Sequence, residues 1–269
     1  MADTKKTKPF LMVLDFDHTI MDENTDMVVQ SAGGVGPMPE EVKAVAREQG
    51  WTAFMQVIIK FDKTRSEWLI LMVFQSVFEH LHANKVSSEA ILATMYAIPF
   101  VPGMRACLEE FKALGGDLII ISDSNQVFID RILSKNDMGH MFEGVFTNPA
   151  EFDSNTGVLN ITPFHRNDDC KLSGVNLCKG RVLQDYLAKK REGGVEYGFV
   201  AYAGDGSNDF CPMLRLGEGD LALARRGDQY SITRCIARKA KEGMDIKARV
   251  EYWDDGNDIR DRVKERIGK

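Results

Sequence analysis

Cysteines are few and scattered in this chain. No C-x-x-C pair occurs among the five, which are Cys107, Cys170, Cys178, Cys211 and Cys235. This spacing favours neither a disulfide framework nor a zinc motif, and a Cys170–Cys178 disulfide is only a minor alternative. The histidines form no ligand pattern either. We therefore expect a reduced protein without a cysteine-based metal site.

Long apolar runs and basic blocks are also missing. The longest apolar run, residues 68–74, is too short to span a bilayer, and residues 1–10 lack the apolar core of a signal peptide. The net charge of -6 argues against broad nucleic-acid binding. These absences predict a cytoplasmic protein with no membrane or nucleic-acid partner, and they leave the oligomeric state open.

What the sequence does contain is an alternation of strand and helix patterns. Short apolar runs predict buried strands at 10–14, 117–121, 144–146, 197–203 and 220–224. Helical patterns follow at 103–114, 125–136, 178–191, 208–216, 228–241 and 257–267. This order predicts an α/β fold with a doubly wound, Rossmann-like parallel sheet. Ligands of such sheets bind beyond the carboxyl ends of the strands.

Residues 24–98 break the alternation. They carry consecutive helical patterns at 39–49, 52–61, 65–82 and 87–97, and the third is apolar on nearly every side. We expect an inserted all-helical cap domain at 24–98 and a discontinuous core of 1–23 and 99–269. Because the insert follows the first strand directly, it would cover that strand's carboxyl end like a lid. A hairpin is predicted at 149–163.

Polar residues collect where three predicted strands end. They are Asp15, Asp17 and Thr19 after the first, Ser122, Asp123 and Asn125 after the second, and Asp205, Gly206, Asn208 and Asp209 after the strand at 197–203. A parallel sheet brings these ends to one edge, where like charges raise each other's pKa. A hard divalent cation removes that conflict, and carboxylate oxygens suit Mg²⁺.

Lys179 is placed unfavourably for a cation. It falls in the first turn of a predicted helix, where the helix dipole disfavours positive charge by a few tenths to about 1 kcal/mol. We interpret this as a weak sign that an anion binds nearby. A solvated surface lysine is the alternative.

Four motifs carry a family resemblance. They are "DFDHT" (15–19), "SDSN" (122–125), "CK" (178–179) and "GDGSND" (204–209), and they resemble, in order, those of haloacid-dehalogenase-type phosphatases. Further stretches, "PFVPGM" (99–104), "NLCKGRVLQDYL" (176–187) and "IKARVEYWDDGNDI" (246–259), are similar to the phosphoethanolamine/phosphocholine and pyridoxal-phosphate phosphatases. Residues 165–178 depart from the His- and Cys-richer stretch of many members, so the resemblance leaves open whether they have a special role such as a second metal site or a redox bond.

The resemblance implies a role for each motif residue. Asp15 would be the nucleophile that forms an aspartyl-phosphate, and Asp17 the general acid and base. Ser122 and Lys179 would bind the phosphoryl oxygens. Mg²⁺, with Mn²⁺ or Co²⁺ as alternatives, would be held by the Asp15 carboxylate, the Asp17 backbone carbonyl and Asp205. Asn208 and Asp209 would orient these ligands.

The expected substrate is a small-molecule phosphate ester. Asp22, Asp26 and Asp123 would stand near the pocket mouth and suit an ammonium headgroup, as in phosphoethanolamine or phosphocholine. Thr19, Asn125 and Gly206 would also line the substrate site. Capping of the helix from 125 is a minor alternative for Ser122 and Asn125, and it is compatible with phosphate binding. Pyridoxal 5'-phosphate is an alternative substrate. A phosphotransferase and a catalytically silent phosphate-binding module are alternative functions, the latter disfavoured because both Asp15 and Asp17 are present.

Overall fold

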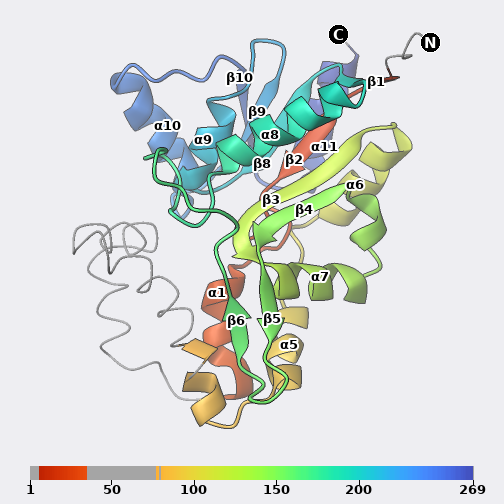
Figure 1. Ribbon diagram of the computed structural model, residues 1–269. Helices are drawn as coiled ribbons and strands as arrows, with labels where there is room; N and C mark the ends of the chain where they lie inside the picture. Colours follow the sequence, from red (N-terminus) through yellow and green to blue (C-terminus); the bar gives the residue numbers. More distant parts are fainter. Residues whose placement is uncertain (1–5, 35–76, 79, 269) are drawn as a thin grey trace.

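A six-stranded parallel sheet forms the centre of the molecule. The computed structural model describes residues 6–34, 77–78 and 80–268. The strands run in the order β10-β9-β8-β2-β3-β4, all parallel (Figure 1). Their bounds are β2 Leu11–Leu14, β3 Asp117–Asn125, β4 Gly144–Asn148, β8 Val200–Gly204, β9 Leu221–Arg225 and β10 Arg249–Trp253. The predicted doubly wound α/β core is confirmed.

Helices cover both faces of this sheet. One apolar cluster joins the sheet to α6 (Met104–Ala113), α7 (Gln126–Lys135) and α11 (Gly256–Ile267). The other joins it to α8 (Lys179–Glu192), α9 (Phe210–Met213) and α10 (Ile232–Lys241). Strand β2 serves both, because its side chains alternate between the clusters and all are fully buried. Each such side chain stabilises the fold by about 1.5–3 kcal/mol.

Smaller elements complete the described part of the chain. Strand β1 (Lys6–Lys8) pairs with β7 (Val195–Tyr197), and η3 (Gly139–Met141) precedes β4. The predicted hairpin is present as β5 (Ala150–Phe152) and β6 (Leu159–Ile161), and it projects beyond the end of β4 (Figure 1). Within the described residues, no helix combines the length and apolar character needed to cross a bilayer.

The chain leaves and re-enters the core at neighbouring positions. The backbone N–H of Asp22 donates to the Pro99 carbonyl at 2.8 Å, and that of Val101 donates to Ile20 at 3.0 Å. Between them the structure describes α1 (Thr25–Val28), η1 (Val29–Gly34) and α5 (Ser88–Tyr96), the last as predicted. The helices predicted at 39–49 and 52–61, and most of that at 65–82, lie outside the described residues. The cap and its boundaries stay a prediction.

Several predicted boundaries differ from the structure. The strand expected at 197–203 is two strands, β7 and β8, because the chain turns at Gly198, where a Cβ would lie 2.6 Å from the Pro9 carbonyl oxygen. The helix expected at 208–216 is the short η4 (Ser207–Asp209) followed by α9, and that expected at 228–241 begins only at Ile232. Strand β10 was not predicted, because Arg249 and Glu251 interrupt its apolar pattern at the sheet edge.

Candidate active site

A buried lysine and two buried aspartates form the centre of the site. Asp15 follows the last residue of β2, and Lys179 begins α8. The Lys179 Nζ lies 2.6 Å from Asp15 Oδ2 and 2.8 Å from Asp209 Oδ1. All three side chains are at most 5% exposed. A fully buried ammonium group persists only when paired, so these contacts explain why the helix tolerates a lysine in its first turn.

Asp209 is held by four donors. Its Oδ1 accepts from Lys179 Nζ and, at 2.7 Å, from the Tyr202 hydroxyl. Its Oδ2 accepts from the backbone N–H groups of Asp205 at 3.0 Å and Gly206 at 2.9 Å. A carboxylate whose two oxygens each accept two hydrogen bonds is held rigidly, which suits a residue that orients Lys179 and the segment around Asp205. The role of Tyr202 was not predicted, because a tyrosine inside an apolar strand looks like an ordinary core residue in the sequence.

Three carboxylates converge at the carboxyl edge of the sheet. Single oxygens of Asp15, Asp205 and Asp209 all lie within 4.8 Å of one another. Burial raises the pKa of Asp15 and of Asp205 well above the usual range, and the charge of Asp209 raises both further. With one lysine among them, the carboxylates leave an excess of negative charge. The buried oxygen donors therefore fit the divalent cation expected from the sequence.

Asp17 is oriented by Thr25 at the start of α1. Asp17 Oδ1 accepts from the Thr25 backbone N–H at 3.1 Å, and Oδ2 accepts from the Thr25 hydroxyl at 3.0 Å. The same hydroxyl lies 2.9 Å from the Ser124 hydroxyl on β3. Burial, with the nearby Asp26, raises the pKa of Asp17 well above its usual range, against the hydrogen bonds from Thr25. Neither Thr25 nor Ser124 was predicted, although Ser124 lies within the second motif and Thr25 lies six residues after the first.

Three expected substrate contacts are deeply buried. Ser122, Asn125 and Thr19 are all fully buried. The Ser122 hydroxyl accepts from the Ser124 backbone N–H at 3.2 Å, and Asn125 Oδ1 caps α7 by accepting from the Phe128 N–H at 3.0 Å. The Asn125 amide nitrogen and the Thr19 hydroxyl have no hydrogen-bond partner among the described residues. Capping is thus one role of Asn125, as the alternative interpretation had it.

Asp26 and Asp123 stand beside this centre. Asp26 is 8% exposed, and its burial, with the charge of Asp123, raises its pKa to about 8. The Asp123 side chain is 48% exposed, and its Oδ1 lies 4.0 Å from Lys179 Nζ. Its Oδ2 accepts from the Asn208 amide at 3.0 Å, which links β3 to η4. The Asp123 carboxylate therefore flanks the Lys179 end of the site.

Asp22 does not provide a free acid, in contrast to the expectation. Its Oδ1 lies 2.5 Å from an Arg225 guanidinium nitrogen on β9. A second nitrogen of Arg225 donates to the His18 carbonyl at 2.5 Å. The arginine neutralises Asp22 and fixes the loop after β2. The pattern of acids after the first motif could not reveal a partner 203 residues away in sequence.

The fold and this constellation define a class of protein. A solved phosphoserine phosphatase, described as a phospho-aspartyl intermediate analogue, superposes with a TM-score of 0.56 over 97% of this chain and 99% of that one. At 19% identity the likeness is one of fold. It is the fold of the haloacid-dehalogenase-type phosphatases that the motifs resemble.

Sequence similarity places the chain in one family within this class of phosphatases. A family model described as "Putative Phosphatase" matches residues 10–68 and 59–267, and the chain belongs to this family. The chain is similar to the human pyridoxal phosphate phosphatase PHOSPHO2, with 35% identity over 256 residues, 93% of this chain and 95% of the relative. It is 34% identical over 254 residues to the human phosphoethanolamine/phosphocholine phosphatase, covering 93% of this chain and 86% of the relative. The chain is a phosphatase.

Proposed function

We propose that the chain is a Mg²⁺-dependent phosphomonoesterase whose substrates are small cationic esters, phosphoethanolamine or phosphocholine. The observation that carries the proposal is the buried triad of Asp15, Lys179 and Asp209 beside Asp17. A nucleophile, a phosphate-binding cation and a proton donor are what the hydrolysis of a phosphate ester requires.

The two aspartates of the first motif would divide the chemistry. Asp15 attacks phosphorus, the bond from phosphorus to the leaving oxygen breaks, and an aspartyl-phosphate forms. Asp17 gives its proton to the leaving oxygen and then takes one from the water that hydrolyses the intermediate. The two hydrogen bonds from Thr25 hold the Asp17 carboxyl in one orientation for both transfers.

Lys179 and Ser122 would bind the transferring phosphoryl group. Lys179 is already held by Asp15 and Asp209, so its positive charge is fixed before the substrate arrives. Preorganised charge of this kind stabilises the transition state without reorganisation at the moment of reaction. The carboxylates of Asp15 and Asp205, with the backbone carbonyl of Asp17, would hold the cation. When bound, Mg²⁺ supplies charge neutralisation for the phosphoryl oxygens.

The charges around the site favour a cationic headgroup. The negative charge of Asp123 raises the pKa of Asp15, and this exposed acid is next to Ser122 in the chain. Asp26 adds a second negative charge only above its pKa of about 8. An ammonium group placed between such acids gains Coulomb attraction, whereas a second phosphate would be repelled. This supports phosphoethanolamine or phosphocholine.

Pyridoxal 5'-phosphate is the second candidate substrate. It is supported by the 35% identity to human PHOSPHO2, which is named for this activity and is as similar as the human phosphoethanolamine/phosphocholine phosphatase at 34%.

A graded set of phosphate esters tests the proposal. Initial rates with phosphocholine, phosphoethanolamine, pyridoxal 5'-phosphate, phosphoserine and p-nitrophenyl phosphate would be compared at fixed Mg²⁺. The proposal predicts the highest kcat/KM for the two cationic esters. A kcat/KM for pyridoxal 5'-phosphate above both would instead assign the second candidate, and no Mg²⁺-dependent turnover of any ester would overturn the proposed function.

A further inference from the structure

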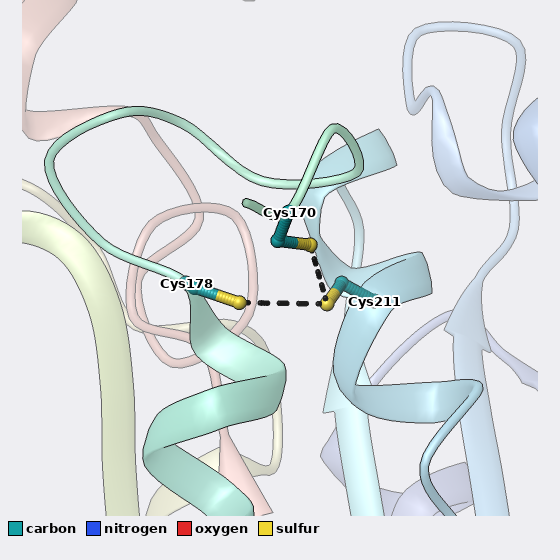
Figure 2. A group of neighbouring side chains, drawn as sticks. All are labelled: Cys170, Cys178 and Cys211. Carbon is teal, nitrogen blue, oxygen red and sulfur yellow. Dashed lines mark hydrogen bonds between the residues drawn. The ribbon is translucent and has the colours of Figure 1, made fainter. Parts of the chain in front are cut away.

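Three thiols converge outside the carboxylate site. Cys170 lies in the loop between β6 and α8, Cys178 immediately precedes α8, and Cys211 belongs to α9. Figure 2 shows the three side chains pointing toward one another. The Sγ of Cys211 lies 3.4 Å from that of Cys170 and 3.8 Å from that of Cys178. All three sulfurs lie within 4.8 Å of one another. The sequence spacing concealed this cluster, because its third member stands far along the chain.

The spacing of the sulfurs matches metal coordination better than a disulfide. All three residues are free cysteines, and a disulfide would need an S–S distance of about 2.05 Å. Zinc–sulfur bonds of about 2.3 Å at tetrahedral angles place two sulfurs about 3.8 Å apart. Three soft thiolates are a ligand set that selects zinc over magnesium.

The loop is folded so that it presents Cys170 to the other two thiols. Asn167 holds it with three hydrogen bonds. Its amide donates to the carbonyls of Cys170 and Gly174, both at 2.9 Å, and its Oδ1 accepts from the Cys170 N–H at 3.1 Å. Asn167 is only 9% exposed, so these hydrogen bonds belong to the packed interior of the loop and hold its conformation. The buried hydroxyl of Ser173 faces the thiols of Cys178 and Cys211.

Close packing brings the other two cysteines together. A Cβ at Gly180 would lie 2.6 Å from Cys211 Sγ, so only glycine lets α9 approach the first turn of α8 this closely. Cys178 also stands at the amino end of α8, a helix of 14 residues, where the dipole stabilises a thiolate. His165 fixes the backbone there, because its Nε2 accepts from the Cys178 N–H at 3.0 Å.

We propose that Cys170, Cys178 and Cys211 bind one Zn²⁺ in a structural site separate from the carboxylates. The three thiols would lose their protons to solvent and ligate as thiolates, with a solvent molecule as the fourth ligand. Cys170 is partly exposed, which leaves room for that molecule.

Such a site would stabilise the phosphate-binding end of the active site. Cys178 directly precedes Lys179, and Cys211 stands two residues after Asp209. A zinc ion would therefore cross-link the two segments whose side chains form the 2.8 Å pair between Lys179 and Asp209. It would also tie the loop 165–178 to both.

Metal analysis of the full-length protein tests the proposal. Protein purified with a reducing agent is loaded with one equivalent of Zn²⁺, dialysed against metal-free buffer, and measured for zinc content and by zinc X-ray absorption. We expect about one zinc per chain, with about three sulfur neighbours at about 2.3 Å. Cobalt substitution should give the absorption bands of sulfur-to-cobalt charge transfer.

Matched variants separate this site from others. Cys170→Ser should weaken zinc binding at least about tenfold and remove the charge-transfer bands. Cys107→Ser, a buried cysteine on α6 outside the cluster, should change neither. Asp205→Asn should leave the sulfur-bound zinc in place. Zinc with only oxygen or nitrogen neighbours would overturn the proposal, and so would loss of the zinc in Asp205→Asn. A Cys170–Cys211 disulfide that persists in protein purified with the reducing agent would overturn it as well.

Discussion

At the scale of single residues, Asp17 and Thr25 form a hydrogen-bonded pair in the active site. One threonine supplies two hydrogen bonds to the carboxyl, and its hydroxyl also contacts Ser124 on another strand. A general acid must keep its orientation through two proton transfers. The threonine therefore acts on the reaction through Asp17, without contacting the phosphate in the proposed scheme.

Replacing Thr25 should affect turnover more than substrate binding. We expect Thr25→Val to lower kcat by roughly tenfold, because a misoriented acid loses part of the effect of general acid catalysis, with KM nearly unchanged. Thr25→Ser keeps the hydroxyl and should restore most of the activity. Thr94→Val is the control, because within the described residues the Thr94 hydroxyl donates to the Ala90 carbonyl of its own helix, α5. Equal losses in Thr25→Ser and Thr25→Val would contradict the positioning role.

Asp26 predicts a pH-dependent preference for cations. With its pKa raised to about 8 by burial and by the charge of Asp123, Asp26 is neutral below that pH and negative above it. The ratio of kcat/KM for phosphocholine to that for its uncharged isostere, 3,3-dimethylbutyl phosphate, should therefore rise by up to about tenfold from about pH 7 to about pH 9. The choline charge is permanent, so the substrate does not titrate.

Asp26→Asn provides the control for this effect. The asparagine cannot ionise, so the ratio should stay constant with pH in the variant. A constant ratio in the unmodified protein, or the same rise in both proteins, would remove Asp26 from headgroup recognition.

At the scale of elements, the end of β8 positions the acids through a close backbone approach. A Cβ at Gly204 would lie 2.3 Å from Asp209 Cγ, inside any permitted contact. The glycine thus lets η4 fold back so that Asp209 accepts from two backbone N–H groups of its own turn. The Asp209 carboxylate thereby connects β8, the turn that follows it and Lys179.

Gly204→Ala should therefore disturb both stability and metal affinity. We expect a loss of about 1–3 kcal/mol in the free energy of unfolding from overpacking, measured by urea denaturation, and a higher Mg²⁺ concentration for half-maximal activity. Gly217→Ala is the matched control, since its Cβ would meet Asp220 Oδ2 at 3.6 Å, an ordinary contact. If both variants unfold at the same urea concentration, the close approach at Gly204 is unimportant.

The strands were predicted from the sequence more fully than the contacts between them. The apolar run 10–14 and the motif at 15–19 predicted β2 and the place of Asp15, because burial on both faces leaves a local signal. The residues that contact the site residues from other segments leave no local signal in the sequence. Arg225 on β9 neutralises Asp22 across 203 residues, and Cys211 completes the thiol cluster across 33 residues from Cys178. Tyr202 is only seven residues from Asp209, but its place in an apolar strand does not distinguish it from a core residue.

At the scale of the whole molecule, Asp117 joins the small β1–β7 sheet to the central one. This buried residue begins β3, its Oδ1 lies 2.9 Å from Lys8 Nζ on β1, and its Oδ2 accepts from the Tyr197 hydroxyl on β7 at 2.8 Å. Burial alone would raise the pKa of Asp117, but these two partners outweigh burial and lower it. The stabilisation is therefore present above the ordinary carboxyl pKa and is lost as the pH falls through the lowered value.

Asp117→Asn should destabilise the protein in a pH-dependent way. We expect the free energy of unfolding to fall by about 1–3 kcal/mol at neutral pH, because the hydrogen bonds to a charged acceptor are weakened. The difference from the unmodified protein should shrink below about pH 4, where the unfolded carboxyl becomes protonated, and should be smallest once the pH falls below the lowered native pKa. Asp168→Asn, at an exposed pair with Arg166, should have no measurable effect. A difference for Asp117→Asn that is independent of pH would contradict the ionic link.

The proposed reaction of the whole molecule depends on a covalent bond between Asp15 and the phosphoryl group. The direct measurement is to quench the enzyme in acid during turnover of phosphocholine, reduce it with borohydride, and map the product by peptide mass spectrometry. Borohydride converts an aspartyl-phosphate to homoserine, so we predict homoserine at position 15 in the substrate-treated sample and aspartate there without substrate. Unmodified Asp15 in an enzyme that is demonstrably turning over, or homoserine at another aspartate, would contradict the account.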